Sequence, residues 1–133
     1  MLRKYPLSLL AIMLIVISAL IAGCGAKGLK LNEAGNDGQV TIGVGEKLAI
    51  ALESNPSTGY TWEISELDTT ILEQVGDIEF VSANPGLLGA GGMQTLTLIA
   101  RQPGQTTVKL VYHRPWEKDV QPLKTYTVTL TIQ

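Results

Sequence analysis

The sequence predicts an all-β protein, an antiparallel β-sandwich of seven to eight strands. From Gln39 onward, apolar and polar residues alternate with the period of two that is typical of half-buried strands. Short segments rich in Gly, Pro and Asn separate these runs and read as turns. No strand–helix–strand alternation occurs, which disfavours a doubly wound fold with a parallel sheet.

Each run presents one mainly apolar face, and the runs follow one another along the chain. In order, these faces are Val40, Ile42 and Val44; Leu48, Ile50 and Leu52; Tyr60, Trp62 and Ile64; Gln94, Leu96, Leu98 and Ala100; Val108, Leu110 and Tyr112; and Tyr126, Val128, Leu130 and Ile132. Residues 78–82 predict a further short strand, and residues 68–76 fit either a short strand or a helical turn. Trp62 is interpreted as a core residue. This many short strands in about 95 residues favours a sandwich of immunoglobulin-like type.

Composition excludes several classes of function. The 133 residues include 12 acidic and 10 basic side chains, one Cys and one His. One Cys allows no disulfide scaffold, and one Cys with one His allows no Cys/His zinc cage, so we expect no metal and no cofactor. The absence of a basic stripe disfavours nucleic-acid binding. An enzyme would have to use His113, for which the sequence offers no partner spacing, and we interpret His113 as solvent-facing.

The N-terminus has the pattern of an export signal, which we assign to residues 1–23. Arg3 and Lys4 precede an apolar run that ends in Leu20-Ile21-Ala22-Gly23-Cys24. This ending resembles the bacterial lipobox, which implies cleavage before Cys24 and lipidation of its thiol. The protein would then be secreted across the cytoplasmic membrane and lipid-anchored to the cell envelope. An ordinary signal peptide with a free thiol, or an uncleaved anchor, is the alternative. Residues 24–38 predict a flexible tether, and residues 39–133 the folded domain.

Three loops interrupt the alternation. The first, Asn55-Pro56-Ser57-Thr58-Gly59-Tyr60, predicts a tight turn with two hydroxyls at its tip. The second spans residues 84–92 and combines four glycines with Leu87 and Leu88; it lacks the Lys and Ser/Thr of a phosphate loop, and its leucines favour contact with a partner. The third, Arg114-Pro115-Trp116, contains two residue types that are enriched at binding hot spots, and we expect Trp116 to be exposed. A Trp116 folded over the sandwich edge, with Arg114 paired to a carboxylate, is the alternative.

The three loops together, in this order, resemble the chagasin family of inhibitors of papain-like cysteine proteases. The segments that carry the resemblance are Asn55–Tyr60, Gly89-Ala90-Gly91-Gly92 and Arg114-Pro115-Trp116, with Ser57 standing where the family typically has Thr. The resemblance implies an immunoglobulin-like fold whose loops form a three-part wedge. It implies that Ser57, Thr58 and Gly59 reach the catalytic centre, that Leu87–Gly92 lies extended along one side of the cleft, and that Arg114 and Trp116 contact the other rim.

The resemblance therefore implies a reversible, competitive inhibitor, which we expect to be a monomer. The alternative function is a generic immunoglobulin-like binding module of a cell-envelope lipoprotein, for example one that binds a glycan. Such a module would not need all three loop segments.

Overall fold

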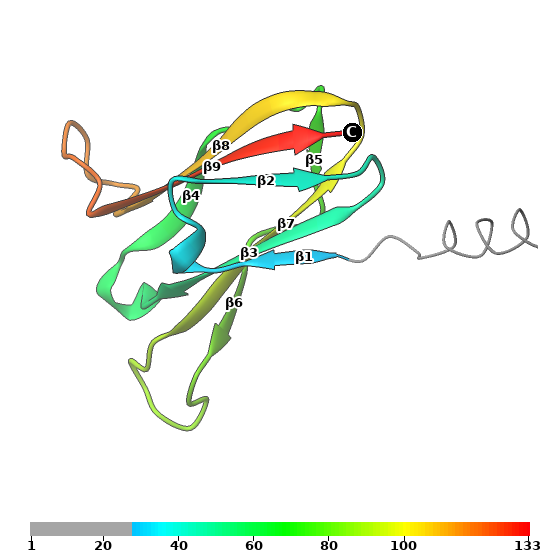
Figure 1. Ribbon diagram of the computed structural model, residues 1–133. Helices are drawn as coiled ribbons and strands as arrows, with labels where there is room; N and C mark the ends of the chain where they lie inside the picture. Colours follow the sequence, from blue (N-terminus) through cyan, green and yellow to red (C-terminus); the bar gives the residue numbers. More distant parts are fainter. Residues whose placement is uncertain (1–27) are drawn as a thin grey trace, which may run out of the picture.

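The computed structural model describes residues 28–133, which form two stacked β-sheets (Figure 1). The first sheet contains β1 (Leu29–Leu31), β3 (Lys47–Ser54), β7 (Gly92–Ala100) and β5 (Leu72–Gln74) in this order, and β6 (Glu79–Ser82) also pairs with β7. The second contains β2 (Gly38–Ile42), β9 (Lys124–Ile132), β8 (Gly104–His113) and β4 (Thr61–Glu66). Two short 3-10 helices, η1 (Glu33–Gly35) and η2 (Pro56–Thr58), complete the fold. Within the described range, no helix is long and apolar enough to cross a membrane. The predicted signal segment and Cys24 lie outside this range.

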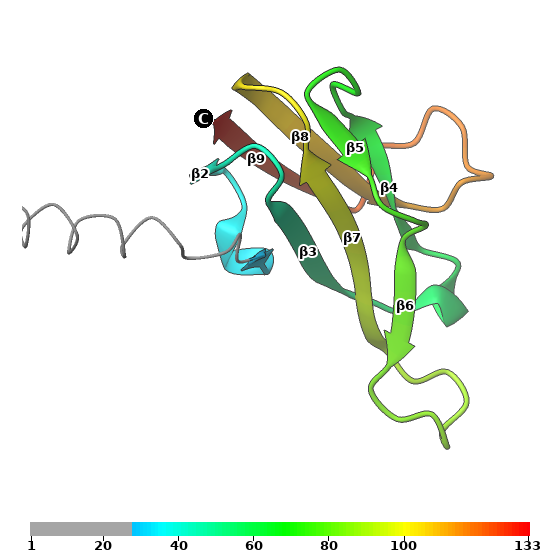
Figure 2. The same ribbon diagram turned by 90° about the vertical axis from the view of Figure 1, so that its right-hand side faces the viewer.

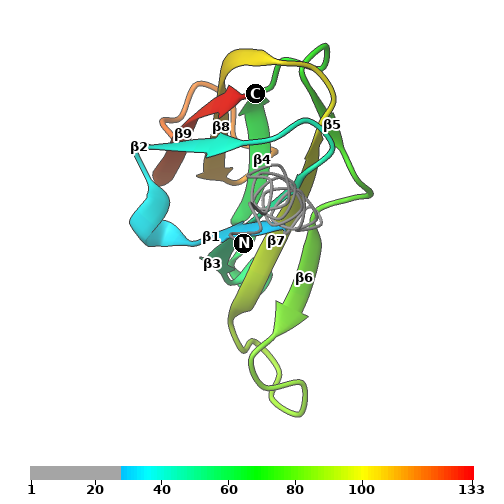
Figure 3. The same cartoon turned by 45° about the vertical axis from the view of Figure 1, so that its right-hand side comes forward.

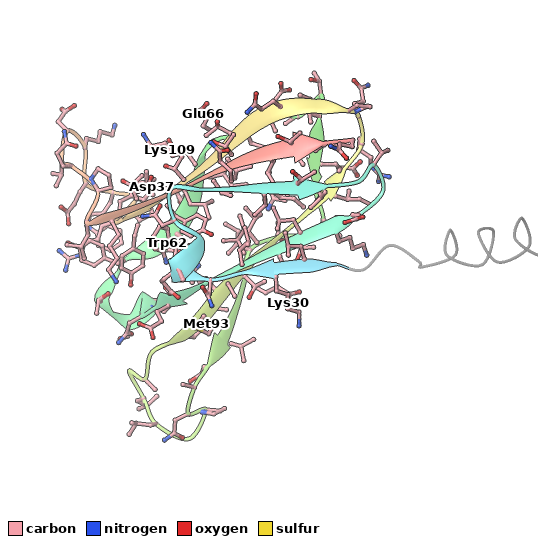
Figure 4. All side chains as sticks on the ribbon, in the orientation of Figure 1. Lys30, Asp37, Trp62, Glu66, Met93 and Lys109 are labelled. Carbon is pink, nitrogen blue, oxygen red and sulfur yellow. The ribbon has the colours of Figure 1, made fainter. Side chains whose placement is uncertain are left out.

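The predicted inward faces make the core between the two sheets. Its buried apolar residues are Ile42, Leu48, Ile50, Leu52, Trp62, Leu72, Leu96, Leu98, Ala100, Val108, Leu110, Tyr112, Tyr126, Val128, Leu130 and Ile132. The prediction that Trp62 is a core residue is confirmed, and Figure 4 places it in the body of the sandwich. Val44 departs from the pattern because β2 ends at Ile42, which leaves Val44 exposed in the turn that follows.

The two sheets are mixed, whereas the sequence predicted purely antiparallel pairing. β1 runs parallel to β3, and β2 runs parallel to β9; the other pairs are antiparallel. The chain crosses through η1 from the edge of the first sheet to the edge of the second, so β1 and β2 each add to a different sheet. A period of two shows which residues face inward, but it carries no information about strand direction.

The predicted tether is wrong from Gly28 onward, because residues 29–38 belong to the folded domain. Leu29 and Leu31 pack against the core, and Lys30 between them points outward (Figure 4). The Asn36 side-chain oxygen accepts a hydrogen bond from the Thr127 backbone amide at 2.9 Å. β1 is only three residues long and stands beside Gly and Asn residues, so its alternation was too short to predict a strand. Residues 28–133 therefore contain nine strands rather than seven or eight.

The loops that interrupt the predicted pattern gather at one end of the sandwich. The β3–β4, β6–β7 and β8–β9 connections lie at this end, and the C-terminus lies at the other (Figures 1 and 2). β1 also begins at the far end, since Leu29 pairs with Leu48 at the start of β3. The predicted short strand at residues 78–82 is β6, and residues 68–76 contain a turn followed by β5.

Tyr126 shows how closely the N-terminal segment covers the core. Its side chain is buried, and its hydroxyl has no hydrogen-bond partner among the described residues. A Cβ on Gly35 would stand 2.6 Å from this hydroxyl, so only glycine fits there. Burial raises the pKa of Tyr126 above 10.0, and the negative charge of Glu33 raises it further.

We therefore predict that Tyr126 destabilises the fold in alkali. Because its pKa is higher in the folded state, the folded state favours the neutral phenol, and this contribution is lost as the pH rises beyond about 10. Tyr126→Phe should reduce the fall in the free energy of unfolding between about pH 8 and pH 11, measured by urea denaturation. At neutral pH the variant should stay within about 1 kcal/mol of the wild type, because no hydrogen bond is lost. An unchanged alkaline slope would contradict this account.

Candidate functional site

The candidate site is the row of three loops at one end of the sandwich. We call residues 55–60 loop 1, residues 83–91 loop 2 and residues 114–123 loop 3. Loop 1 joins the two sheets, loop 2 extends the first sheet, and loop 3 extends the second. Figure 3 shows β6, β7 and loop 2 reaching beyond the body of the sandwich as an arm.

Loop 1 is a tight turn organised by Asn55. The Asn55 side-chain oxygen accepts hydrogen bonds from the Ser57 amide and the Ser57 hydroxyl, and thereby caps η2. The Thr58 hydroxyl donates to the Asn55 carbonyl at 2.6 Å. Gly59 ends the turn with a φ of 85°, a conformation that glycine adopts without strain. The two hydroxyls expected at the tip are exposed, but both are turned back to Asn55, so they stiffen the loop.

Loop 2 is tied to loop 1 by the same side chain. The Asn55 amide nitrogen donates to the Gly89 carbonyl at 3.1 Å. Within loop 2, the Leu87 amide donates to the Asn84 carbonyl and the Ala90 amide donates to the Leu87 carbonyl. Two successive turns, Asn84–Leu87 and Leu87–Ala90, therefore make up most of the loop, and the implied extended conformation of Leu87–Gly92 is wrong for Leu87–Ala90. Leu87 is 61% exposed and Leu88 is fully exposed.

Loop 3 packs against loop 1 from the other side. Trp116 is 67% exposed, as expected, but one edge of its ring lies against Gly59. The Arg114 Nε donates to the Thr58 carbonyl at 3.1 Å, and its guanidinium lies 4.5 Å from the centre of the Tyr60 ring. Arg114 also forms an ion pair with Glu117 at 3.0 Å. Arg114 is thus an internal support for loop 1 as well as a residue at the rim.

An aromatic stack connects these loops to the core. The Tyr112 ring centre lies 5.1 Å from that of Trp62 and 5.4 Å from that of Tyr60. The Tyr112 hydroxyl accepts a hydrogen bond from the Asn55 backbone amide at 3.0 Å. Sequence reasoning placed Tyr112 only among the inward residues; its position two residues before the third loop was the available signal.

A buried polar group lies directly below loop 1. The Gln94 side-chain oxygen accepts hydrogen bonds from the Ser54 hydroxyl at 2.6 Å and from the Trp62 amide at 2.9 Å. Its nitrogen donates to the Thr61 hydroxyl at 2.9 Å. Gln94 therefore joins β3, β7 and β4 at the point where loop 1 leaves and re-enters the sheets. Its inward position was predicted, but its role as a bridge was not.

The one histidine near the loops, His113, is paired with a carboxylate. His113 Nε2 lies 2.7 Å from Glu63 Oε2 on the partly exposed surface of the second sheet. The described residues contain no group of three His, Cys, Asp or Glu side chains that could hold a metal ion. The loop end presents small polar and apolar groups in a fixed shape, which is suited to binding a complementary surface.

Comparison with known proteins gives one consistent result. The sequence profile of the family described as chagasin family peptidase inhibitor I42 matches residues 41–130. The chain is similar to Amoebiasin-1 of Entamoeba histolytica, with 32% identity over 79% of this chain and 100% of the relative. It is similar to Chagasin of Trypanosoma cruzi, with 32% identity over 76% of this chain and 94% of the relative. The crystal structure of a cysteine protease inhibitor from Entamoeba histolytica superposes with a TM-score of 0.71 and 32% identity, covering 79% of this chain and 95% of that one.

The contact between Gly59 and Trp116 can be tested directly. A Cβ on Gly59 would stand 2.3 Å from Trp116 Cη2, so Gly59→Ala should displace the indole and shift its N–H signal in the NMR spectrum. Gly45→Ala is a matched control, since Gly45 has a similar φ of 87° with nothing within 4 Å. Both variants should lose about 1 kcal/mol or more through backbone strain, but only Gly59→Ala should move the Trp116 signal. Equal shifts in the two variants would contradict the contact.

Proposed function

The chain belongs to the chagasin family of peptidase inhibitors, and we propose that it inhibits papain-like cysteine proteases by filling their active-site cleft with loops 1, 2 and 3. Like the other members of this family, it is an inhibitor of cysteine proteases and not an enzyme. The finer proposal concerns which loops bind and how.

The observation that carries the proposal is the locking of three loops into one rigid row. Asn55 holds loop 2 to loop 1, while Arg114 and Trp116 hold loop 3 to loop 1. A surface that is ordered before it binds loses little conformational entropy on docking. Loop 1 lies in the middle of the row and would enter the cleft, and loops 2 and 3 would contact the walls on either side.

The structure of loop 1 also suggests why a protease would not cleave it quickly. Its backbone forms a 3-10 turn, in which the Thr58 amide bonds to the Asn55 carbonyl and the Gly59 amide to the Pro56 carbonyl. Bonds from Ser57 and Thr58 side chains add to this network. An extended peptide segment would require the turn to open first. Inhibition is therefore proposed to be reversible, competitive and purely steric.

The exposed apolar side chains of the flanking loops would supply much of the binding energy. Leu87 and Leu88 on loop 2 and Trp116 on loop 3 are all more than half exposed. Large apolar and aromatic side chains of this kind are common anchors in protein–protein interfaces.

We also propose that the mature protein is a monomer, anchored to the cell envelope by lipid on Cys24. The lipobox-like ending of the N-terminal segment supports the anchor. The folded part starts at the end of the sandwich opposite the loops, where Gly28 lies beside Lys47. An anchor attached there would leave the three loops accessible to a protease from solution.

Inhibition of papain tests the proposed function. A soluble protein of residues 25–133 should inhibit papain stoichiometrically, and Trp116→Ala should raise the inhibition constant at least about tenfold. Leu88→Ala removes a fully exposed side chain, so any loss of affinity must come from a contact with the protease. Val75→Ala, at an exposed position outside the loops, is the control and should inhibit like the wild type. Rapid cleavage of the folded wild type, or full papain activity in its presence, would refute the proposal.

The anchor has its own test. In the full-length chain, expressed in a bacterium with the lipoprotein pathway, a clickable fatty acid should label the wild type but not Cys24→Ser. Labelling is measured instead of membrane fractionation, because the variant would also lose cleavage before position 24 and keep its apolar N-terminal run. Papain inhibition should be unchanged, because Cys24 is remote from the loops in sequence and the described part of the chain begins at the end of the sandwich opposite the loops. Equal labelling of the two proteins, or no labelling of the wild type, would exclude lipidation of Cys24 as the anchor.

A further inference from the structure

Exposed apolar side chains gather at the loop end beyond the residues that the family motifs include. Nine large hydrophobic residues are exposed in residues 28–133: Val44, Val75, Phe80, Val81, Leu87, Leu88, Trp116, Val120 and Leu123. Single exposed apolar residues are normal, and Val44 and Val75 are of this kind. The other seven lie on the β6–loop 2 arm or on loop 3.

Loop 3 carries an apolar pair that the Arg-Pro-Trp segment does not contain. Val120 is 58% exposed and Leu123 is 59% exposed, in the half of the loop that returns to β9. Neither residue was singled out from the sequence, because this half of the loop has no alternation from which to predict burial.

The returning half of loop 3 is held at its β9 end by a backbone hydrogen bond. Asp119 adopts a φ of 59° and turns the chain, while the Leu123 amide donates to the Tyr112 carbonyl at 2.8 Å. Pro122 restricts the backbone between them. The apolar pair is thus presented on an ordered segment that rests on the same tyrosine as loop 1.

Val120, the first residue of the apolar pair, adjoins the proposed interface, and Leu123 follows three residues later on the same segment. Val120, Tyr60 and Arg114 line one shallow hollow, in which Arg114 supports loop 1. Loop 3 projects away from the body of the sandwich in both Figure 1 and Figure 2. A protease seated on loop 1 and Trp116 would therefore meet the outer half of loop 3 next.

We propose that Val120 and Leu123 form a secondary contact with the target protease, on an apolar surface of the protease outside its active-site cleft. This inference rests on the proposed function and extends it. The pair lies outside the three segments that carry the family resemblance. It would therefore affect which papain-like proteases are bound tightly, while loop 1 blocks the catalytic centre of each of them.

Charge substitution tests the proposal. Val120→Asp and Leu123→Asp should each raise the inhibition constant for papain or for a cathepsin-like protease about tenfold or more, mainly through faster dissociation. Val44→Asp is the matched control, because Val44 is 48% exposed in the β2–β3 turn at the opposite end. Thermal unfolding of each variant should match the wild type, since neither side chain is buried.

Photo-crosslinking supplies a readout that does not depend on affinity. Benzoylphenylalanine in place of Val120 should form an adduct with the bound protease, whereas the same probe in place of Val44 should not. The proposal requires both weaker inhibition by the charged variants and an adduct at position 120. A wild-type inhibition constant in both charged variants, or no adduct at position 120, would overturn it. A wild-type dimer in sedimentation that Val120→Asp dissociates would also overturn it, by assigning the pair to self-association. If the wild type itself inhibits no papain-like protease, the proposed function has failed instead.

Discussion

The loop end of the sandwich depends on the hydrogen bonds made by the buried side-chain amide of Gln94. It bonds to Ser54 at the end of β3 and to Thr61 and Trp62 at the start of β4, so it fixes both roots of loop 1. A buried polar group that loses its partners costs about 1–3 kcal/mol. An apolar residue of similar size at position 94 would leave the Ser54 hydroxyl and the Trp62 amide without this partner. The two sheets would then no longer be held at one spacing where the loop leaves them.

From Gln94 outward, each contact fixes the next one. Trp62 stacks on Tyr112, Tyr112 bonds to the backbone of Asn55, and Asn55 caps the turn and holds loop 2. On the other side, Tyr60 stacks on Tyr112 and supports Arg114, which bonds to Thr58. The row of loops is therefore an extension of the core. A binding surface built in this way has its shape before a partner arrives, which is what a steric inhibitor requires.

The sequence was sufficient to predict the longer strands and the core position of Trp62 from local alternation, and the exposure of Trp116 from its place outside that alternation. It was not sufficient for β1, which is too short to show a period, or for the direction of β1 and β2. The turns of loop 2 were missed because glycine is compatible with both extended and turned backbone. The bridge through Gln94 and the support from Arg114 join residues that are 32 to 56 positions apart. Alternation shows that such residues face inward or lie in a loop, but it does not show which distant group each one meets.

The site residues therefore form two groups, those that contact other parts of this protein and those whose side chains are free to contact a partner. Asn55, Gly59 and Arg114 contact neighbouring loops and determine the shape of the row. Leu88 is fully exposed and Trp116 largely so, and they have most of their surface free for a partner. A change in the first group alters the shape that every protease meets, so its effect should be similar for all targets. A change in the second group removes a contact with one particular surface, and its effect should depend on which protease is bound. Inhibitory strength and target preference are thus separable properties of neighbouring residues in the same three loops.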